Sequence, residues 1–332
     1  MGTIRTTPRR PVLPTPTRWL TPLLISLLCS CAGPDPGADS FDEDGAKPAT
    51  PSPAPTIEEL ANARYDGLTE QTVTLVDGEW QGEPVAEDAA SRPMIGLVED
   101  FHVVLDADGD GNEEAIALLW SSSGGSGTFD YLALMGRDND QIVNLGTADL
   151  GDRVSIRSYD VEQGRLVLEV VQAGPRDARC CPGEVVRRSW AWIDNRFSEL
   201  PSEPLGRLSL AHLEGVEWIL ERLTWKEPVA SEPAITLIVQ DQNISGTAGC
   251  NRFQANVDPG DMPGDLAVGP VAATSRSCGD TIDALESRFL EALSGVNRYS
   301  FMAGKLVLSW SHGDQWNTMV FAPRPLATPS NS

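Results

Sequence analysis

The feature that most constrains the fold of this chain is a series of short apolar runs between residues 57 and 200. The runs alternate apolar with polar side chains or are rich in β-branched residues, which is the pattern of half-buried strands. They are TVTLVDGEW, FHVVLD, AIALLW, DYLALM, RVSIRSYDV, RLVLEVVQ and RSWAWID. Turns rich in Gly, Asp, Asn and Ser separate them. Short strands at this spacing predict an antiparallel sheet, sandwich or small barrel, preceded by a helix that Thr56 and Glu59 can cap.

Residues 213–323 show a mixed pattern. EWILERL, AITLIVQ and ISGTAGCNRFQANV predict strands, the last of which contains Cys250. In DTIDALESRFLEAL the apolar residues recur at helical spacing, Asp280 can cap the helix, and Gly295 can end it. YSFMAG, KLVLSW and WNTMVFA then predict a meander. This region is therefore predicted to be α+β, with an antiparallel sheet and one main helix.

The length of 332 residues allows two domains with separate cores. We expect a mostly antiparallel β domain over residues 57–200 and an α+β domain over residues 213–323, joined by a linker at residues 201–212. Residues 324–332 are expected to form a disordered tail. The predicted fold class of the whole chain is therefore α+β with two domains.

Residues 1–30 resemble a lipoprotein signal peptide. Four arginines precede the apolar run WLTPLLISLLC, which is too short to span a bilayer, since spanning needs about 20 apolar residues. The run ends in LLCSCAG, which resembles a bacterial lipobox and predicts lipid attachment at Cys31. The alternative is an ordinary secretory signal that is cleaved nearby. Residues 31–56 are rich in Pro, Asp, Ala and Ser and predict a disordered tether.

The residue after Cys31 bears on location. It is Ala32, where an aspartate favours retention in the inner membrane of enteric bacteria. We therefore expect attachment to the outer membrane, facing the periplasm. Several acyl chains, at about 0.8 kcal/mol per buried CH2, make such an anchor stable, so the membrane is the first expected partner.

The charge balance is acidic, with 25 Lys and Arg against 48 Asp and Glu, and a net charge of −23. Removing residues 1–30 takes away four arginines and no acids, so the net charge becomes −27. Nucleic-acid binding depends on cations placed against phosphates, so this composition excludes nucleic acid as a partner. It favours cationic small molecules, divalent ions or basic envelope proteins.

Four cysteines follow Cys31. An even number in an oxidising compartment favours disulfides. Cys250 is either a reactive thiol or half of a bridge, and neither it nor Cys278 has an adjacent histidine that would make a thiolate nucleophile. A bridge between them closes a loop of about 29 residues, which contributes roughly 3–4 kcal/mol. The adjacent Cys180 and Cys181 are a candidate redox or soft-metal pair, or a structural pair in a turn.

The stretch DADGDGNEE is the sharpest chemical feature. Carboxylates at alternate positions of one tight loop can converge on a hard cation, which makes calcium the candidate cofactor. The predicted ligands are Asp106, Asp108, Asp110, the backbone carbonyl of Asn112, and Glu114. The twelfth loop position is Ala117 rather than the glutamate of an EF-hand, and the flanks predict strands. The loop resembles the strand-loop-strand calcium loops of FG-GAP-type repeats, and the alternative is a solvated hairpin.

No combination of residues predicts catalysis. SSSGGSGTF lacks the Lys-Ser/Thr of a phosphate loop, and Ser126 lacks the glycine and the helix of a nucleophile elbow. The histidines, His102, His212 and His312, fall in three separate segments. We therefore expect the chain not to be an enzyme.

Several motifs between residues 213 and 323 together resemble a known family. WIL, ISGTAGCNRFQANV, VGPVAATSRSC, ESRFLEAL and YSFMAGKLVLSW occur in that order, as in a META domain, the module of the heat-inducible lipoprotein family called HslJ. The resemblance implies an α+β fold, an envelope location and an association with stress or antibiotic tolerance, but no known reaction. SRSC departs from the family, which more often has a methionine before the cysteine.

The upstream region also has a resemblance. The stretch from DADGDGNEE to DYLALM, with LGDRVSI and CCPGEV, is similar to a lipoprotein-associated module without an assigned activity. The leading hypothesis is therefore a non-catalytic envelope lipoprotein that binds a partner or helps to maintain the envelope. The alternatives are a calcium-dependent recognition module and a periplasmic hydrolase or thiol oxidoreductase.

Overall fold

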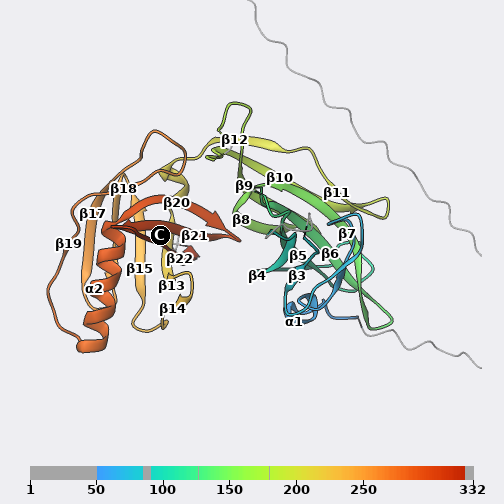
Figure 1. Ribbon diagram of the computed structural model, residues 1–332, viewed down its shortest axis with the longest axis horizontal. Helices are drawn as coiled ribbons and strands as arrows, with labels where there is room; N and C mark the ends of the chain where they lie inside the picture. Colours follow the sequence, from blue (N-terminus) through green and yellow to red (C-terminus); the bar gives the residue numbers. More distant parts are fainter. Residues whose placement is uncertain (1–50, 85–90, 126, 179, 326–332) are drawn as a thin grey trace, which may run out of the picture. The chain divides into compact units, whose positions relative to one another are not determined.

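The computed structural model describes residues 51–84, 91–125, 127–178 and 180–325 (Figure 1). These residues belong to one compact unit. The fold consists mostly of antiparallel β-sheets with few helices, and the antiparallel sheets agree with the prediction from the sequence. The predicted signal peptide, Cys31 and residues 326–332 lie outside the described residues.

The first sheet consists of five antiparallel strands that pair in chain order. They are β3 (Glu79–Gln81), β4 (Met94–Leu105), β5 (Glu114–Ser122), β6 (Phe129–Asp138) and β7 (Gln141–Asp152). The central strand β5 is buried from Glu114 to Leu119, because both faces of this sheet are covered. AIALLW is accordingly a nearly continuous apolar run rather than an alternating one.

A second antiparallel sheet covers one face of the first. Its strands are β8 (Ser155–Glu162), β9 (Arg165–Gln172), β10 (Glu184–Ile193) and β11 (Arg196–Glu199), with β12 (Glu203–Arg207) beside β10. Buried residues of both sheets form one cluster, which includes Phe101, Ile116, Leu132, Leu168 and Trp190. The two sheets therefore form a sandwich.

The other face of the first sheet is covered by α1 (Ile57–Leu60), β1 (Arg64–Tyr65) and β2 (Val73–Thr74). Thr56 and Glu59 form the predicted capping box. The end of the predicted tether differs from expectation, because Pro53 accepts a hydrogen bond from Arg137 and Pro55 contacts His102 Nε2 at 2.8 Å. These backbone carbonyls find partners on the sheet, so the part of the predicted tether next to residue 57 packs on the folded domain.

The C-terminal sheet has the strand order β18-β17-β16-β15-β13-β22-β21-β20, with β14 beside β13 and β19 beside β17. The strands are β13 (Val216–Thr224), β14 (Glu227–Pro228), β15 (Ile235–Gln240), β16 (Asn243–Ala248), β17 (Arg252–Asp258), β18 (Ala267–Val268), β19 (Ala272–Ala273), β20 (Val296–Met302), β21 (Lys305–His312) and β22 (Gln315–Pro325). Residues just before β18 also bond to β20, since Leu266 N donates to Asn297 O (3.1 Å) and Tyr299 N donates to Gly264 O (2.7 Å). These bonds join the two ends of the sheet.

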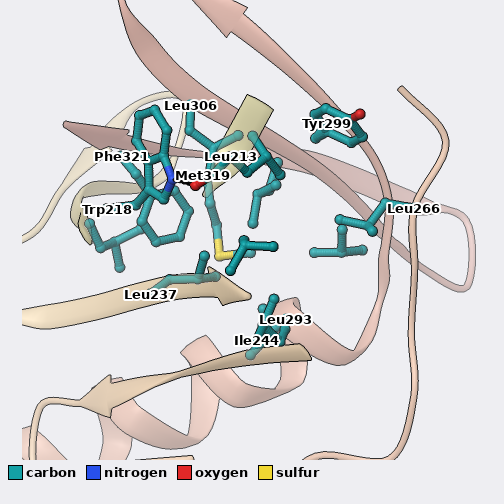
Figure 2. Close-up of a cluster of buried hydrophobic side chains, with 14 of the residues drawn as sticks. Leu213, Trp218, Leu237, Ile244, Leu266, Leu293, Tyr299, Leu306, Met319 and Phe321 are labelled. Carbon is teal, nitrogen blue, oxygen red and sulfur yellow. Dashed lines mark hydrogen bonds between the residues drawn. The ribbon is translucent and has the colours of Figure 1, made fainter. Parts of the chain in front are cut away.

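Helix α2 (Asp280–Ser294) packs on this sheet through Phe289, Ala292 and Leu293. Figure 2 shows Leu293 in one cluster with side chains from several strands and from η1 (Leu210–Leu213). The labelled strand residues include Trp218, Leu237, Ile244, Met319 and Phe321. The predicted helix is therefore present, and its apolar stripe contributes to the core.

Three local predictions were wrong. ISGTAGCNRFQANV is two strands, β16 and β17, and Cys250 lies in the turn between them because Gly249 adopts a φ of 95° that interrupts the strand. The N-cap of α2 is Gly279 rather than Asp280, and the Asp283 carboxylate accepts the Cys278 backbone N–H (2.9 Å). Arg324 and Pro325, which were predicted to belong to the tail, are the last residues of β22. The predicted linker holds β12 and most of η1.

Candidate functional site

The Asp-rich loop lies between β4 and β5, so its flanks are the predicted strands. Asp106, Asp108 and Glu114 each offer a carboxylate oxygen, and these three oxygens lie within 4.8 Å of one another. Asp106 and Asp108 are exposed, whereas Glu114 is 5% exposed at the start of β5. The loop therefore places three of the predicted ligands within reach of one cation.

The backbone of this loop is organised by its own carboxylates. Asp106 accepts hydrogen bonds from the backbone N–H groups of Gly109 (2.8 Å) and Gly111 (3.2 Å), whose φ angles are 79° and 91°. Asp108 Oδ1 accepts from Asp110 N (3.0 Å). The two glycines permit the left-handed conformation that these bonds require.

The other two predicted ligands are not in the carboxylate cluster. Asp110 accepts from both the backbone N–H (2.7 Å) and the side-chain amide (2.9 Å) of Asn112, and these bonds lower the pKa of Asp110. Asn112 Oδ1 accepts from Ser52 N (2.9 Å), and Glu113 N donates to Ser52 O (3.1 Å). The ordered end of the predicted tether is thereby bonded to this loop.

Glu114 has an environment that disfavours its charge. Burial raises the pKa of its carboxyl, the hydrogen bond from Ala107 N (2.8 Å) opposes that rise, and the charges of Asp108, Asp110 and Asp106 add to it. Carboxylates that repel one another at such short range are relieved by a bound cation. The electrostatics of the loop therefore suit a divalent ion.

Cys180 and Cys181 are free thiols in a turn between β9 and β10, the first exposed and the second buried. A hydrogen bond with Cys181 raises the pKa of the Cys180 thiol, and a smaller desolvation effect adds to the rise. Asp177 holds this turn by accepting from Gly174 N and Gly183 N, both at 2.9 Å. A lowered pKa is what activates a cysteine, and the shift at Cys180 is in the opposite direction.

Cys250 and Cys278 form a disulfide, with their Cα atoms 5.9 Å apart. The more informative residue here is Asn251, which is 3% exposed. Its amide nitrogen donates to Arg276 O and to Glu286 Oε1, both at 2.8 Å. Its amide oxygen accepts from Thr274 Oγ1 and Arg276 N, both at 2.9 Å. Asn251 thereby joins the β16–β17 turn to α2 and to the segment before Cys278.

Our sequence reasoning missed this network. An asparagine after Gly-Cys fits an exposed turn residue, and Glu286 fits the polar face of the helix. The partners lie 23 to 35 residues from Asn251. The resemblance to the META domain was the available signal for this network, because its motifs include both the segment around Cys250 and the later segment that contains Cys278.

The remaining candidates lie apart. His212 Nδ1 lies 3.1 Å from Ser209 O, and His312 Nδ1 lies 3.7 Å from Glu291. Ser126 lies outside the described residues, and β6 rather than a helix follows its hairpin. Within the described ranges, no helix is both long and apolar enough to span a membrane.

Comparison with protein families matches residues 211–322 to the META domain. The resemblance predicted from the motifs is therefore confirmed for this part of the chain. A search of curated proteins finds no match.

Two solved structures are similar to part of the chain. A protein determined by NMR is 21% identical, with 35% of this chain and 94% of that chain covered and a TM-score of 0.29. A second, from Burkholderia xenovorans, is 22% identical, with 35% and 86% covered and a TM-score of 0.29.

Proposed function

We propose that this chain is a lipid-anchored protein of the bacterial envelope, attached through Cys31 at the periplasmic face of the outer membrane. Its folded part binds an envelope partner and serves envelope maintenance rather than catalysing a reaction. The observation that carries this proposal is the META domain at residues 211–322, together with the lipobox-like sequence at residues 28–31. The two-domain α+β organisation, with the first domain at residues 57–200, belongs to the same proposal.

The candidate reactive groups near Cys250 have structural partners. Cys250 is bridged to Cys278, and Asn251 uses its amide for structure. The thiol pKa of Cys180 is raised, which is opposite to what a nucleophile requires. The polar chemistry at these positions therefore stabilises the fold.

Two experiments test the proposal. Cells expressing the full chain are labelled with a palmitate analogue, and we expect label on the wild type and on Cys29→Ala but none on Cys31→Ala. The cysteine two residues earlier is the matched control, and label on Cys31→Ala would refute the anchor. Crosslinking in intact envelopes, followed by capture and mass spectrometry, should then identify a partner with wild type. Recovery of no crosslinked partner would refute the binding role.

A second candidate function is calcium-dependent recognition by the Asp-rich loop. It is favoured by the convergence of Asp106, Asp108 and Glu114 and by the raised pKa of Glu114. Calcium should raise the melting temperature of the wild type and have little effect on D106N/D108N. Asp140→Asn, in the β6–β7 turn, is the control and should respond like the wild type. An equal response of D106N/D108N and wild type would dismiss the site.

A further inference from the structure

A cleft of about 350 Å³ lies where the β-sandwich meets the β20–β21 hairpin. Its apolar lining comes from Tyr159, Val216, Trp218, Ala303 and Pro323. Its polar lining comes from Asp100, Arg157, Ser158 and Lys305. A concave site of this size with apolar walls and a few convergent polar groups is typical of small-molecule binding.

Two of the polar residues lie where strand pairing is irregular. On β4 the pairing with β5 shifts register between Leu97 and His102, and Asp100 lies within that shift. On β8 the pairing with β9 shifts between Ile156 and Ser158, so Arg157 is the extra residue of a bulge. Bulges redirect side chains and are common beside binding sites. Here two separate sheets have irregularities that face the same cleft.

The turn of the β20–β21 hairpin also lines the cleft. Ala303 has a φ of 49° and Gly304 a φ of 82°, and Gly304 N donates to Ile156 O (3.0 Å). A side chain at Gly304 would start 3.2 Å from the Tyr159 ring. Positive φ at both central residues is the usual geometry of a two-residue β-hairpin, and the hydrogen bond to Ile156 places this turn against β8.

Two of the charged groups keep N–H donors that a ligand could use, beside the Asp100 carboxylate, which also lines the cleft. Lys305 Nζ donates to Asp100 (2.8 Å) and Glu221 (2.7 Å), so one of its three N–H groups remains. Arg157 donates from Nε to His212 O (3.1 Å) and from Nη1 to Glu169, and no partner of its Nη2 is found among the described residues. Ser158 and Tyr159 also line this space.

We propose that this cleft binds a small apolar molecule carrying one carboxylate. The apolar body would lie against Trp218, Val216 and Tyr159, and the carboxylate would accept hydrogen bonds from Arg157 and Lys305. This inference rests on the binding role proposed above and names a ligand class for it. The proposed ligand is an anion, whereas the net charge of the chain favours cations. The difference arises because Arg157 and Lys305 act locally in the cleft, while the excess of acidic residues is spread over the whole chain.

The test uses 1-naphthoate as the probe and its uncharged analogue 1-naphthamide, with the full chain, by isothermal titration. We expect naphthoate to bind at one site and naphthamide to bind at least tenfold more weakly. Ser158→Trp, which fills the cleft, should abolish binding, and Arg157→Met should weaken it about tenfold. Arg187→Met is the matched control, because Arg187 forms an exposed pair with Glu162 on the same sheet.

A second measurement guards against misfolding of the variants. In the wild type, amide resonances of Ser158, Gly304 and Lys305 should shift as naphthoate is added. Absence of saturable binding, equal affinity for naphthamide, or unchanged binding by Ser158→Trp would each overturn the proposal. Capture of an envelope partner by a protein that ignores naphthoate would overturn the cleft alone and leave the proposed function standing.

Discussion

Replacement of Asn251 by alanine would remove four side-chain hydrogen bonds at a position that is 3% exposed. A neutral hydrogen bond contributes about 0.5–1.5 kcal/mol, and one to a charged group such as Glu286 about 1.5–3 kcal/mol. Thr274 and Arg276 are exposed, so water replaces part of the loss. We therefore expect the free energy of unfolding to fall by about 3 kcal/mol.

Urea unfolding of the full chain measures this loss. The matched control is Asn243→Ala, an exposed asparagine that donates one local bond to Asp241 O (3.1 Å) and should change stability by less than about 0.5 kcal/mol. A double-mutant cycle with Glu286→Gln should show coupling, because the Glu286 carboxylate accepts from both the backbone and the side chain of Asn251. A loss below about 1 kcal/mol for Asn251→Ala, or additive effects in the cycle, would refute the structural role of the network.

Three further predictions concern stability. Cys250→Ser/Cys278→Ser should lower the free energy of unfolding by about 3–4 kcal/mol in urea melts, because the loop opens in the unfolded state; an unchanged midpoint would contradict this. Burial, with further contributions from nearby aspartates, raises the pKa of Asp130 to about 7. As pH rises, this carboxyl therefore loses its proton in the unfolded state before it does so in the folded state. The free energy of unfolding of the wild type should therefore fall as pH rises from about 4 to about 7. The stability gained by Asp130→Asn should grow across that window, and a constant difference between the two proteins would argue against it. Glu114→Gln should be more stable than wild type near pH 7 in calcium-free buffer, as measured by melting temperature, because burial raises the pKa of Glu114; a lower melting temperature would count against that reasoning.

The parts of the fold that the sequence predicts are those determined by residues close to one another in the chain. The run of apolar and β-branched residues in RLVLEVVQ predicts β9, which is buried along most of its length. The helical spacing in DTIDALESRFLEAL predicts α2, because burial of one stripe of a helix requires that periodicity. The capping box at Thr56 follows from two residues three positions apart. The Asp-rich loop was also predictable, since its Asp and Gly residues organise one another over a few positions.

The wrong prediction around Cys250 and the missed burial of Asn251 both depend on residues that are distant in the chain. In ISGTAGCNRFQANV the β-type residues on both sides of Cys250 suggested one strand, but the left-handed Gly249 starts a turn that the disulfide and the Asn251 network then hold. The burial of Asn251 depends on α2 and on the segment before Cys278. Neither neighbour can be identified from the residues adjacent to Asn251, because tertiary packing decides which polar side chains are enclosed.

The cleft is the strongest case of this limit. Arg157 is redirected because β8 has one more residue than the facing part of β9, and that difference exists only once the two strands have paired. Asp100 depends in the same way on the pairing of β4 with β5. Lys305 then meets Asp100 across 205 positions of sequence. A site whose polar groups are directed by pairing irregularities leaves no motif in the sequence, whereas a metal loop formed by consecutive residues does. The sequence motifs therefore predict the calcium loop. The cleft depends on strand register and on packing, and no motif predicts it.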